Sequence, residues 1–190
     1  DPDNPKWEQI ANAGREYTMN NLTNEQAVSS LVELIKEIIW WMMSDKIMIT
    51  GSRGFIGSVL TKYFDNPIEY DIALDRGMSV LNKHALSLFM DKVKPNIIIH
   101  LAGNSLPSKS VKDPVYDMNL NIGGTLNLLE VCKNRKIDLL LFSSTAYVYG
   151  EPQYLPVDEN HQQVHPNLPY GISKSACESY CNYYREKYGI

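Results

Sequence analysis

Apolar residues in the first fifth of the chain recur three and four positions apart, which is the period of an amphipathic helix. This pattern extends over residues 27–38, and Thr23 and Gln26 before it have the spacing of a capping box. A second, short helix is predicted at Trp7–Tyr17. We therefore expect residues 1–42 to form an appended helical segment.

Within this segment, Ile10–Tyr17 faintly resembles the last helices of certain glycosyltransferases.

From residue 43 onward, short apolar runs alternate with segments of helical period. The runs predict strands at 47–50, 68–74, 96–102 and 138–143, and the periodic segments predict helices at 55–64, 82–93, 115–134 and 169–188. Such alternation is typical of α/β proteins with a doubly wound parallel sheet and right-handed crossovers. We expect residues 43–190 to form one Rossmann-type domain.

A glycine-rich turn joins the first predicted strand to the first predicted helix. Gly51, Gly54 and Gly57 follow one another at three-residue intervals, and Phe55 and Ile56 open the helix. The glycines permit a tight turn, a close approach of a dinucleotide diphosphate and close packing of helix on strand. The free N–H groups of the helix N-terminus would bind that diphosphate.

Three charged residues bear on which dinucleotide is bound. Asp75 closes the predicted strand 68–74, where an acidic side chain can take the hydroxyls of the adenine ribose and favour NAD. Arg53 and Arg76 could instead meet the 2′-phosphate of NADP, because guanidinium binds phosphate as a fork. We expect NAD, with NADP left open.

The third predicted strand ends in His100-Leu101-Ala102-Gly103. The small residues of this segment would let a cofactor lie flat, so Leu101, Ala102 and Gly103 are candidate cofactor-binding residues. His100 is interpreted as a packed core histidine rather than a catalyst.

Tyr170 and Lys174 carry the strongest chemical signal. They lie four residues apart on a predicted helix and therefore share one face. A nearby ammonium, helped by the positive nicotinamide of the cofactor, favours the phenolate and lowers the pKa of a tyrosine, which could then take a proton from a sugar hydroxyl. Thr145, or its neighbour Ser144, follows a predicted buried strand and could hydrogen-bond the reacting oxygen.

Five stretches, at 50–57, 100–103, 121–125, 143–150 and 170–174, occur in one order. They resemble the successive motifs of the extended short-chain dehydrogenase/reductase family, and within it the NAD-dependent nucleotide-sugar epimerases and dehydratases of the UDP-glucose 4-epimerase type. This resemblance implies that Thr145, Tyr170 and Lys174 are catalytic and that Tyr170 and Lys174 also contact the cofactor. It further implies that Asp75 binds the ribose and that Asn121 is a structural asparagine.

The chain departs from this family pattern in three places. Ala146 and Tyr147 stand where the related 4,6-dehydratases carry an Asp-Glu pair, so water elimination lacks its acid and base. The connection from Asp75 to the helix at residue 82 is short, and this feature and Arg53 look more like GDP-fucose synthase and dTDP-4-dehydrorhamnose reductase. Ser79 stands where the family often has an aspartate near the adenine.

Two activities therefore remain open. The first is an NAD-dependent nucleotide-sugar epimerase acting at a sugar carbon, usually C4, and the second is an NADP-dependent keto-sugar reductase. Because the sequence ends at Ile190, where the family's next strand would begin, we also consider an inactive dinucleotide-binding fragment. The family resemblance implies a homodimer built on the helices 115–134 and 169–188.

Composition narrows the remaining classes of partner. Apolar residues make up 44% of the chain, which is enough for a core, and the net charge of −4 with interspersed signs indicates no nucleic-acid partner. The apolar run 38–43 is too short to span a bilayer, so no membrane partner is expected. Three cysteines without framework spacing favour free thiols in a cytoplasmic protein, and we expect no metal site.

Overall fold

The computed structural model describes residues 24–39, 46–154, 157–158, 160–163 and 165–190. The predicted helix Trp7–Tyr17, the N-cap Thr23 and the boundary between residues 42 and 43 lie outside these residues. The chain divides into two compact units, of which the larger comprises residues 45–151 and 163–190. The smaller unit contains α2 (Asn24–Ile39), and this helix confirms the periodicity of residues 27–38.

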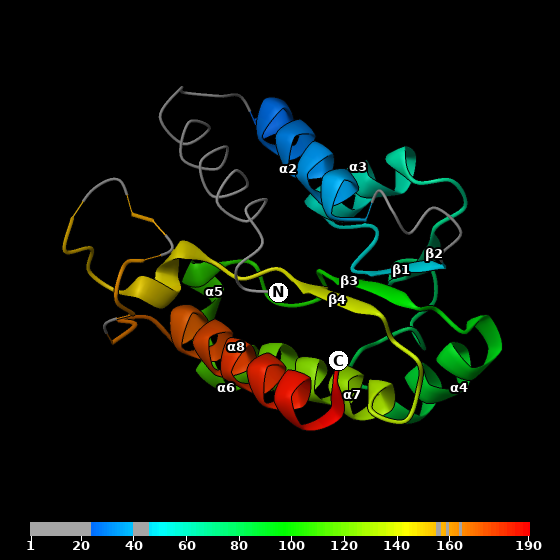
Figure 1. The fold of residues 1–190 in the computed structure, drawn as a ribbon. Coiled ribbons are helices and arrows are strands. Elements are labelled where there is room, and N and C mark those ends of the chain that lie inside the picture. The colour runs from blue at the N-terminus through cyan, green and yellow to red at the C-terminus, as the bar shows by residue number, and fades with distance from the viewer. Residues whose placement is uncertain (1–23, 40–45, 155–156, 159, 164) are drawn as a thin grey trace. The chain divides into compact units, whose positions relative to one another are not determined.

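A parallel sheet of four strands forms the centre of the larger unit (Figure 1). The strands are β1 (Ile47–Thr50), β2 (Ile68–Tyr70), β3 (Ile97–His100) and β4 (Leu139–Phe142), in the order β2-β1-β3-β4. This arrangement confirms the doubly wound α/β fold. The chain turns to opposite sides after β1 and β3, so a crevice opens beyond the carboxyl ends of these neighbouring strands.

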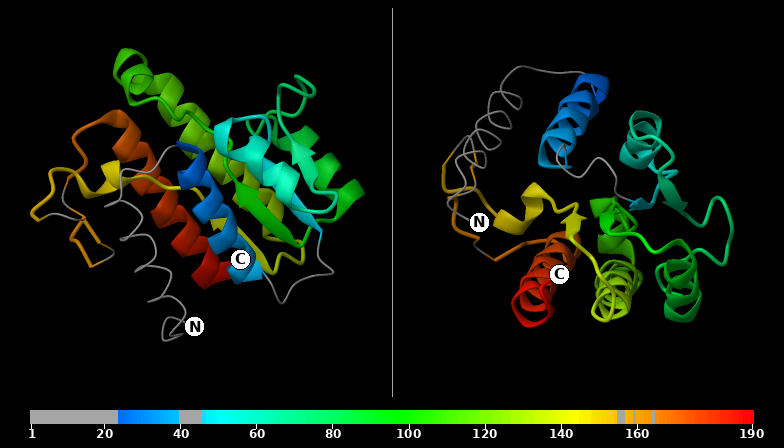
Figure 2. Two further views of the ribbon diagram at one scale, coloured as in Figure 1. Left: turned by 90° about the horizontal axis from the view of Figure 1, so that it is seen from above. Right: turned by 45° about the vertical axis from the view of Figure 1, so that its right-hand side comes forward.

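Helices cover both faces of the sheet (Figures 1 and 2). One face carries α3 (Phe55–Tyr63), and the other carries α4 (Lys83–Val93), α7 (Gly124–Cys132) and α8 (Pro169–Tyr188). The main apolar core lies between the sheet and this second layer; its buried members include Met48, Leu86, Met90, Ile98 and Leu128.

The second strand is shorter than the sequence predicts. The apolar run extends to Leu74, but β2 ends at Tyr70. Asp71 ends the strand because its carboxylate accepts hydrogen bonds from the backbone N–H groups of Ala73, at 2.7 Å, and Arg53, at 2.9 Å. The first of these bonds closes an Asx turn, which diverts the chain from the sheet.

The helix predicted at 115–134 is present but has a wide turn at its middle. It consists of α6 (Pro114–Met118), the π-helical turn η2 (Asn119–Gly123) and α7, with helical backbone angles at the junctions. Single π-helical turns are frequent at functional sites, and η2 contains Asn121.

Two further short elements were not predicted. They are the helix α5 (Pro107–Lys112) and the 3₁₀ turn η3 (Ala146–Tyr149).

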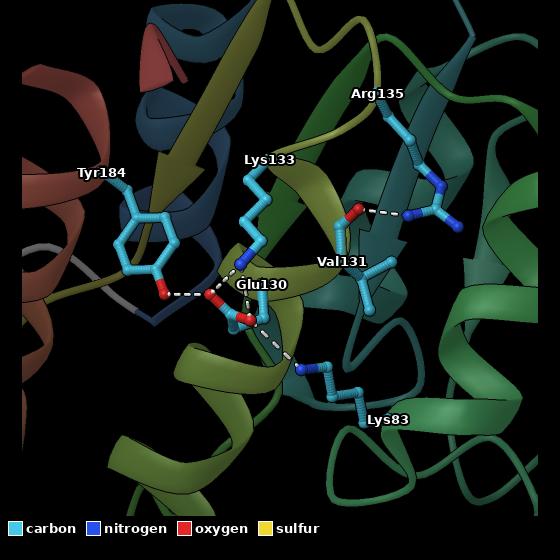
Figure 3. Close-up of polar contacts among 6 residues, drawn as sticks. All are labelled: Lys83, Glu130, Val131, Lys133, Arg135 and Tyr184. Atoms are coloured by element: carbon cyan, nitrogen blue, oxygen red, sulfur yellow. Dashed lines mark hydrogen bonds and ion pairs between the residues drawn. The ribbon is translucent and has the colours of Figure 1, made fainter. Parts of the chain in front are cut away.

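A cluster of charges around Glu130 joins the three helices of the second layer (Figure 3). The Glu130 carboxylate accepts hydrogen bonds from Tyr184 on α8 at 2.6 Å, Lys133 at the end of α7 at 3.0 Å and Lys83 on α4 at 3.2 Å. These bonds, that of Tyr184 foremost, lower the pKa of Glu130 to about 2. The cluster fixes the helix layer that carries Tyr170 and Lys174.

The cysteines and the helices of the described residues bear on the expected free thiols and on the expected absence of a membrane span. Cys132 and Cys177 are buried, Cys181 is half-buried, and all three are free thiols. Within the described part of the chain, no helix is both long enough and apolar enough to cross a membrane.

Candidate functional site

A cavity of about 570 Å³ opens beyond the carboxyl ends of β1, β2 and β3. Its walls bring together the glycine turn, the end of β2, the segment after β3 and the first turns of α8. The sequence-predicted residues that line it are Gly51, Arg53, Gly54, Phe55, Ile56, Gly57, Leu101, Ala102, Gly103, Tyr170 and Lys174. The cavity lies wholly within the larger unit.

The glycine turn has the shape of an anion cradle. Gly51 has φ of +70°, and a Cβ there would lie 2.7 Å from the backbone nitrogen of Ala102. A Cβ on Gly57 would lie 2.2 Å from the carbonyl oxygen of Gly51. The first residues of α3 line the cavity, so the N–H groups and the positive dipole of its N-terminus face it. No side-chain cap and no acidic residue of the first turn occupies this N-terminus. These features fit a dinucleotide diphosphate.

The acidic residue at the end of β2 is Asp71, not Asp75. Asp71 lines the cavity, whereas Asp75 is exposed, is absent from the cavity wall and accepts a hydrogen bond from the Gly77 N–H at 2.7 Å. Arg76 is likewise exposed and outside the wall. Asp75 was assigned because the predicted strand, 68–74, extends past the true end of β2. The sequence does carry a signal for Asp71, because this charged residue interrupts the apolar run 68–74.

Arg53 is held at two points by residues of β2 and its end. Its backbone N–H donates to Asp71, and its guanidinium Nη2 lies 2.9 Å from Glu69 Oε1. The glycine turn and the second strand are thereby tied together at the rim of the cavity. Glu69 was not singled out from the sequence.

His100 is a core residue, as interpreted from the sequence. Its ring is buried, with Nδ1 2.7 Å from the Thr50 hydroxyl and Nε2 3.1 Å from the Thr125 hydroxyl. Burial lowers the pKa of His100 to about 3, with a smaller effect from the Lys174 ammonium. The neutral imidazole therefore donates one hydrogen bond and accepts another, and it joins β1, β3 and α7.

Tyr170 stands at the start of α8 with its backbone fixed from outside the helix. Its N–H has no acceptor within α8 and donates to Ser110 Oγ of α5 at 3.1 Å. Burial raises the pKa of Tyr170, and a hydrogen bond with Thr145 opposes this rise. In the protein chain alone the pKa of Tyr170 is therefore raised, with desolvation of the phenol as the largest effect. The lowering expected from Lys174 together with a positive nicotinamide stays a prediction.

Lys174 is buried one turn further along α8. Its Nζ donates to the Ser143 carbonyl at 2.8 Å and lies 4.7 Å from the centre of the Phe142 ring. Burial lowers the pKa of Lys174, because charge is costly to desolvate. The end of β4 thus fixes the ammonium beside the cavity.

Three successive residues after β4 contact three positions of α8 that are four residues apart. The Ser143 carbonyl accepts from Lys174, the Ser144 hydroxyl donates to Glu178, and the Thr145 side chain lies close enough to the Tyr170 phenol to lower its pKa. The second oxygen of Glu178 accepts from Gln163 Nε2 at 2.8 Å. Ser144 is thereby engaged away from Tyr170, and Thr145 is the hydroxyl next to it.

Asn121 links the π-helical turn to the site. Its Oδ1 accepts the backbone N–H of Asn104 at 2.8 Å, and its Nδ2 donates to Asp117 Oδ1 at 3.0 Å and Ser173 Oγ at 2.9 Å. Asn104 Nδ2 donates to the same Asp117 oxygen at 2.7 Å. Sequence reasoning missed Asn104 and Asp117, because no local pattern marks two polar residues that meet only in the folded chain.

Known proteins share this fold and these motifs. Residues 47–190 match the model of the NAD dependent epimerase/dehydratase family. A Methanocaldococcus jannaschii protein that carries the provisional name UDP-glucose 4-epimerase is 37% identical in an alignment of 162 positions, which covers 76% of this chain and 52% of that protein.

Two solved structures are similar in sequence as well as in fold. UDP-glucose 4-epimerase from Brucella ovis, in complex with NAD, is 30% identical with a TM-score of 0.69, over 77% of this chain and 49% of that one. RMD from Pseudomonas aeruginosa, complexed with NADPH, is 30% identical with a TM-score of 0.65, over 76% of this chain and 50% of that one. The chain spans about half the length of the curated relatives it matches.

Proposed function

The chain belongs to the NAD dependent epimerase/dehydratase family, and on this premise we propose that it is the cofactor-binding half of a nucleotide-sugar epimerase. The observation that carries the proposal is that Tyr170 and Lys174 line the same cavity as the glycine turn, while Thr145 lies outside the cavity wall next to Tyr170. The similar proteins that are named as UDP-glucose 4-epimerases support a UDP-sugar as substrate.

We expect NAD to lie along the cavity. The glycine turn and the N-terminus of α3 would hold the diphosphate, and Asp71, rather than Asp75, would accept the hydroxyls of the adenine ribose. Leu101, Ala102 and Gly103 would lie along the cofactor, and Tyr170 and Lys174 would stand at the nicotinamide end.

The chemistry at that end is a proton transfer coupled to hydride transfer. When bound, NAD supplies the hydride acceptor and, in the second half of the reaction, the hydride donor. Tyr170 takes the proton of a sugar hydroxyl, at C4 by family resemblance, and returns it when the keto group is reduced on its other face. Thr145 orients the reacting oxygen, and Lys174 stabilises the phenolate.

A dehydratase and a keto-sugar reductase are the two alternatives to the proposed epimerase. Ala146 and Tyr147 place no carboxylate beside Thr145, which argues against a dehydratase. A keto-sugar reductase using NADPH is favoured by one observation, that Arg53 lines the cavity, and by the NADPH in the similar RMD structure. In a reductase, Tyr170 would donate the proton.

Cofactor retention tests the proposal. An epimerase regenerates its NAD within each cycle and has no need to release it, whereas a reductase must exchange its cofactor. We expect mass spectrometry of the small molecules released on denaturation to detect NAD at close to one per chain. Recovery of NADP, or an empty site that binds only NADPH, would favour the reductase, and a site that binds neither dinucleotide would overturn both.

Replacing the proposed base provides the catalytic test. With the chain joined to the remaining half that its relatives possess, Tyr170→Phe should lower UDP-sugar epimerisation by about 10²- to 10⁴-fold, the usual contribution of a general base. NAD binding should be nearly unchanged. Tyr180→Phe, which removes an exposed phenol of the same helix, is the matched control. Full activity of the Tyr170 variant would refute the assignment.

A further inference from the structure

Arg53 stands at the adenine-ribose end of the cavity, between two carboxylates. Its backbone N–H donates to Asp71 Oδ2 at 2.9 Å, and its guanidinium pairs with Glu69 Oε1 at 2.9 Å. Among the described residues that line the cavity, Arg53 and Lys174 are the cationic ones, and Lys174 is bound to Ser143 near Tyr170. Arg53 is therefore the cation in this wall that a phosphate on the adenine ribose could recruit.

In the ion pair of Arg53 and Glu69, the Glu69 side chain is the less exposed of the two. The Glu69 side chain is 26% exposed and that of Arg53 is 48% exposed. Glu69 Oε2 is buried and accepts no hydrogen bond from the residues that the structure describes. If Arg53 turned toward a ligand, this half-buried carboxylate would lose its charge partner, and such unpairing is unfavourable.

The two possible dinucleotides differ at this point. NAD presents a 2′-hydroxyl, which can donate to Asp71. NADP presents a phosphate monoester with a charge of about −1.5 to −2 at pH 7, which would meet Asp71 and needs a cation to offset the repulsion. A guanidinium that already pairs with Glu69 is a poor partner for it.

We propose that Glu69 is a specificity-determining residue, which holds Arg53 away from a 2′-phosphate and so makes the site select NAD over NADP. The proposal rests on the dinucleotide site of the proposed function. It also predicts how the preference can be shifted, because Glu69 acts through Arg53 and does not itself line the cavity.

The test is a set of dinucleotide titrations on the purified chain, by isothermal calorimetry after removal of any retained cofactor. Glu69→Gln keeps the shape of the side chain and removes its charge. We expect it to tighten NADP⁺ binding about fivefold, the usual size of one partly exposed charge pair, and to leave NAD⁺ binding unchanged. Asp91→Asn, which removes a carboxylate from an ion pair with Arg135, should change neither affinity.

A double-mutant comparison identifies the route of the effect. In an Arg53→Ala background, Glu69→Gln should no longer improve NADP⁺ binding, because there is no guanidinium to release. An equal improvement in that background would mean direct repulsion by Glu69 and would overturn the proposal. Arg53→Ala alone should scarcely weaken NADP⁺ binding while Glu69 is present, and a large loss would contradict the proposal even if Glu69→Gln failed to fold.

The titrations give different results if only the role of Glu69 is wrong and if the proposed function is wrong. Tight NAD⁺ binding with an unchanged NADP⁺ affinity in Glu69→Gln would overturn the role of Glu69 and leave the proposed function standing. Binding of neither dinucleotide by any of these variants or by the unaltered chain would overturn the proposed function and, with it, this inference.

Discussion

The ring of His100 is a neutral link inside the sheet, held by Thr50 and Thr125 and buried among apolar residues. Its pKa of about 3 in the folded chain lies well below the value of about 6.5 expected when the chain is unfolded. The folded state therefore binds fewer protons than the unfolded state between these two values. Stability from His100 is complete above pH 6.5 and is lost as the pH falls toward 3.

Replacing His100 should make the protein less sensitive to acid. Glutamine offers both a donor and an acceptor but does not titrate, so His100→Gln will cost stability at pH 7.5. Between pH 6.5 and 4.5 its unfolding free energy should fall less steeply than that of the unaltered chain, by up to about 1.4 kcal/mol per pH unit. Urea denaturation across this range measures the slopes. The exposed His84→Gln is the control, and parallel curves for His100→Gln would refute the assignment.

Residue-level predictions from the sequence succeeded where the chemistry is local in the chain. The three glycines and the pair of Tyr170 and Lys174 line one cavity because each set is fixed by a single turn or helix. Asp71 was missed because Ile72 and Leu74 continue an apolar pattern that its Asx turn overrides. The raised pKa of Tyr170 depends on burial, which no spacing of residues reveals.

Among the secondary-structure elements, the long periodic segments were predicted well, since α4 and α8 match their expected ranges within one residue. The helix α5 was missed because its six residues are too few to establish a period. The π-helical turn was missed because its dihedral angles remain helical and only the hydrogen-bond spacing changes. Both α5 and the π-helical turn support the site, the first through Ser110 and the second through Asn121.

Glu130 links α4, α7 and α8, because it accepts hydrogen bonds from Tyr184, Lys133 and Lys83. Glu130→Gln should lower the unfolding free energy at pH 7 by about 1 kcal/mol, a modest value because the carboxylate remains open to solvent screening. The lowered pKa of Glu130 means that its contribution is present above about pH 4.5 and disappears as the pH falls toward 2.

The difference between Glu130→Gln and the unaltered chain should therefore shrink in acid, as measured by urea denaturation at pH 7 and pH 3. Glu186→Gln, an exposed change on α8, is the matched control and should have little effect at either pH. A deficit of equal size at both values of pH would show that packing of the side chain, rather than its charge, stabilises the helix layer.

The larger unit carries an apolar face of exposed residues on two of its helices. Ile172, Tyr180 and Tyr183 recur at helical spacing on α8 and are exposed, and Val115 and Met118 are exposed on the adjacent α6. Aromatic residues and methionine are enriched in protein interfaces. With the homodimer that the family resemblance implies, we expect this face to pair with a second copy, which would leave the cavity on the opposite edge of α8 open to its ligands.

Analytical ultracentrifugation should therefore find a concentration-dependent species of twice the 21.6 kDa chain mass. Tyr183→Asp places a charge in the proposed interface and should shift the equilibrium to monomer, because an unpaired charge is costly to bury. Leu88→Asp is a fair control, since Leu88 is 58% exposed and Tyr183 52%, but Leu88 lies on α4. A monomer at every concentration, or equal dissociation by both variants, would show that these helices are not the contact.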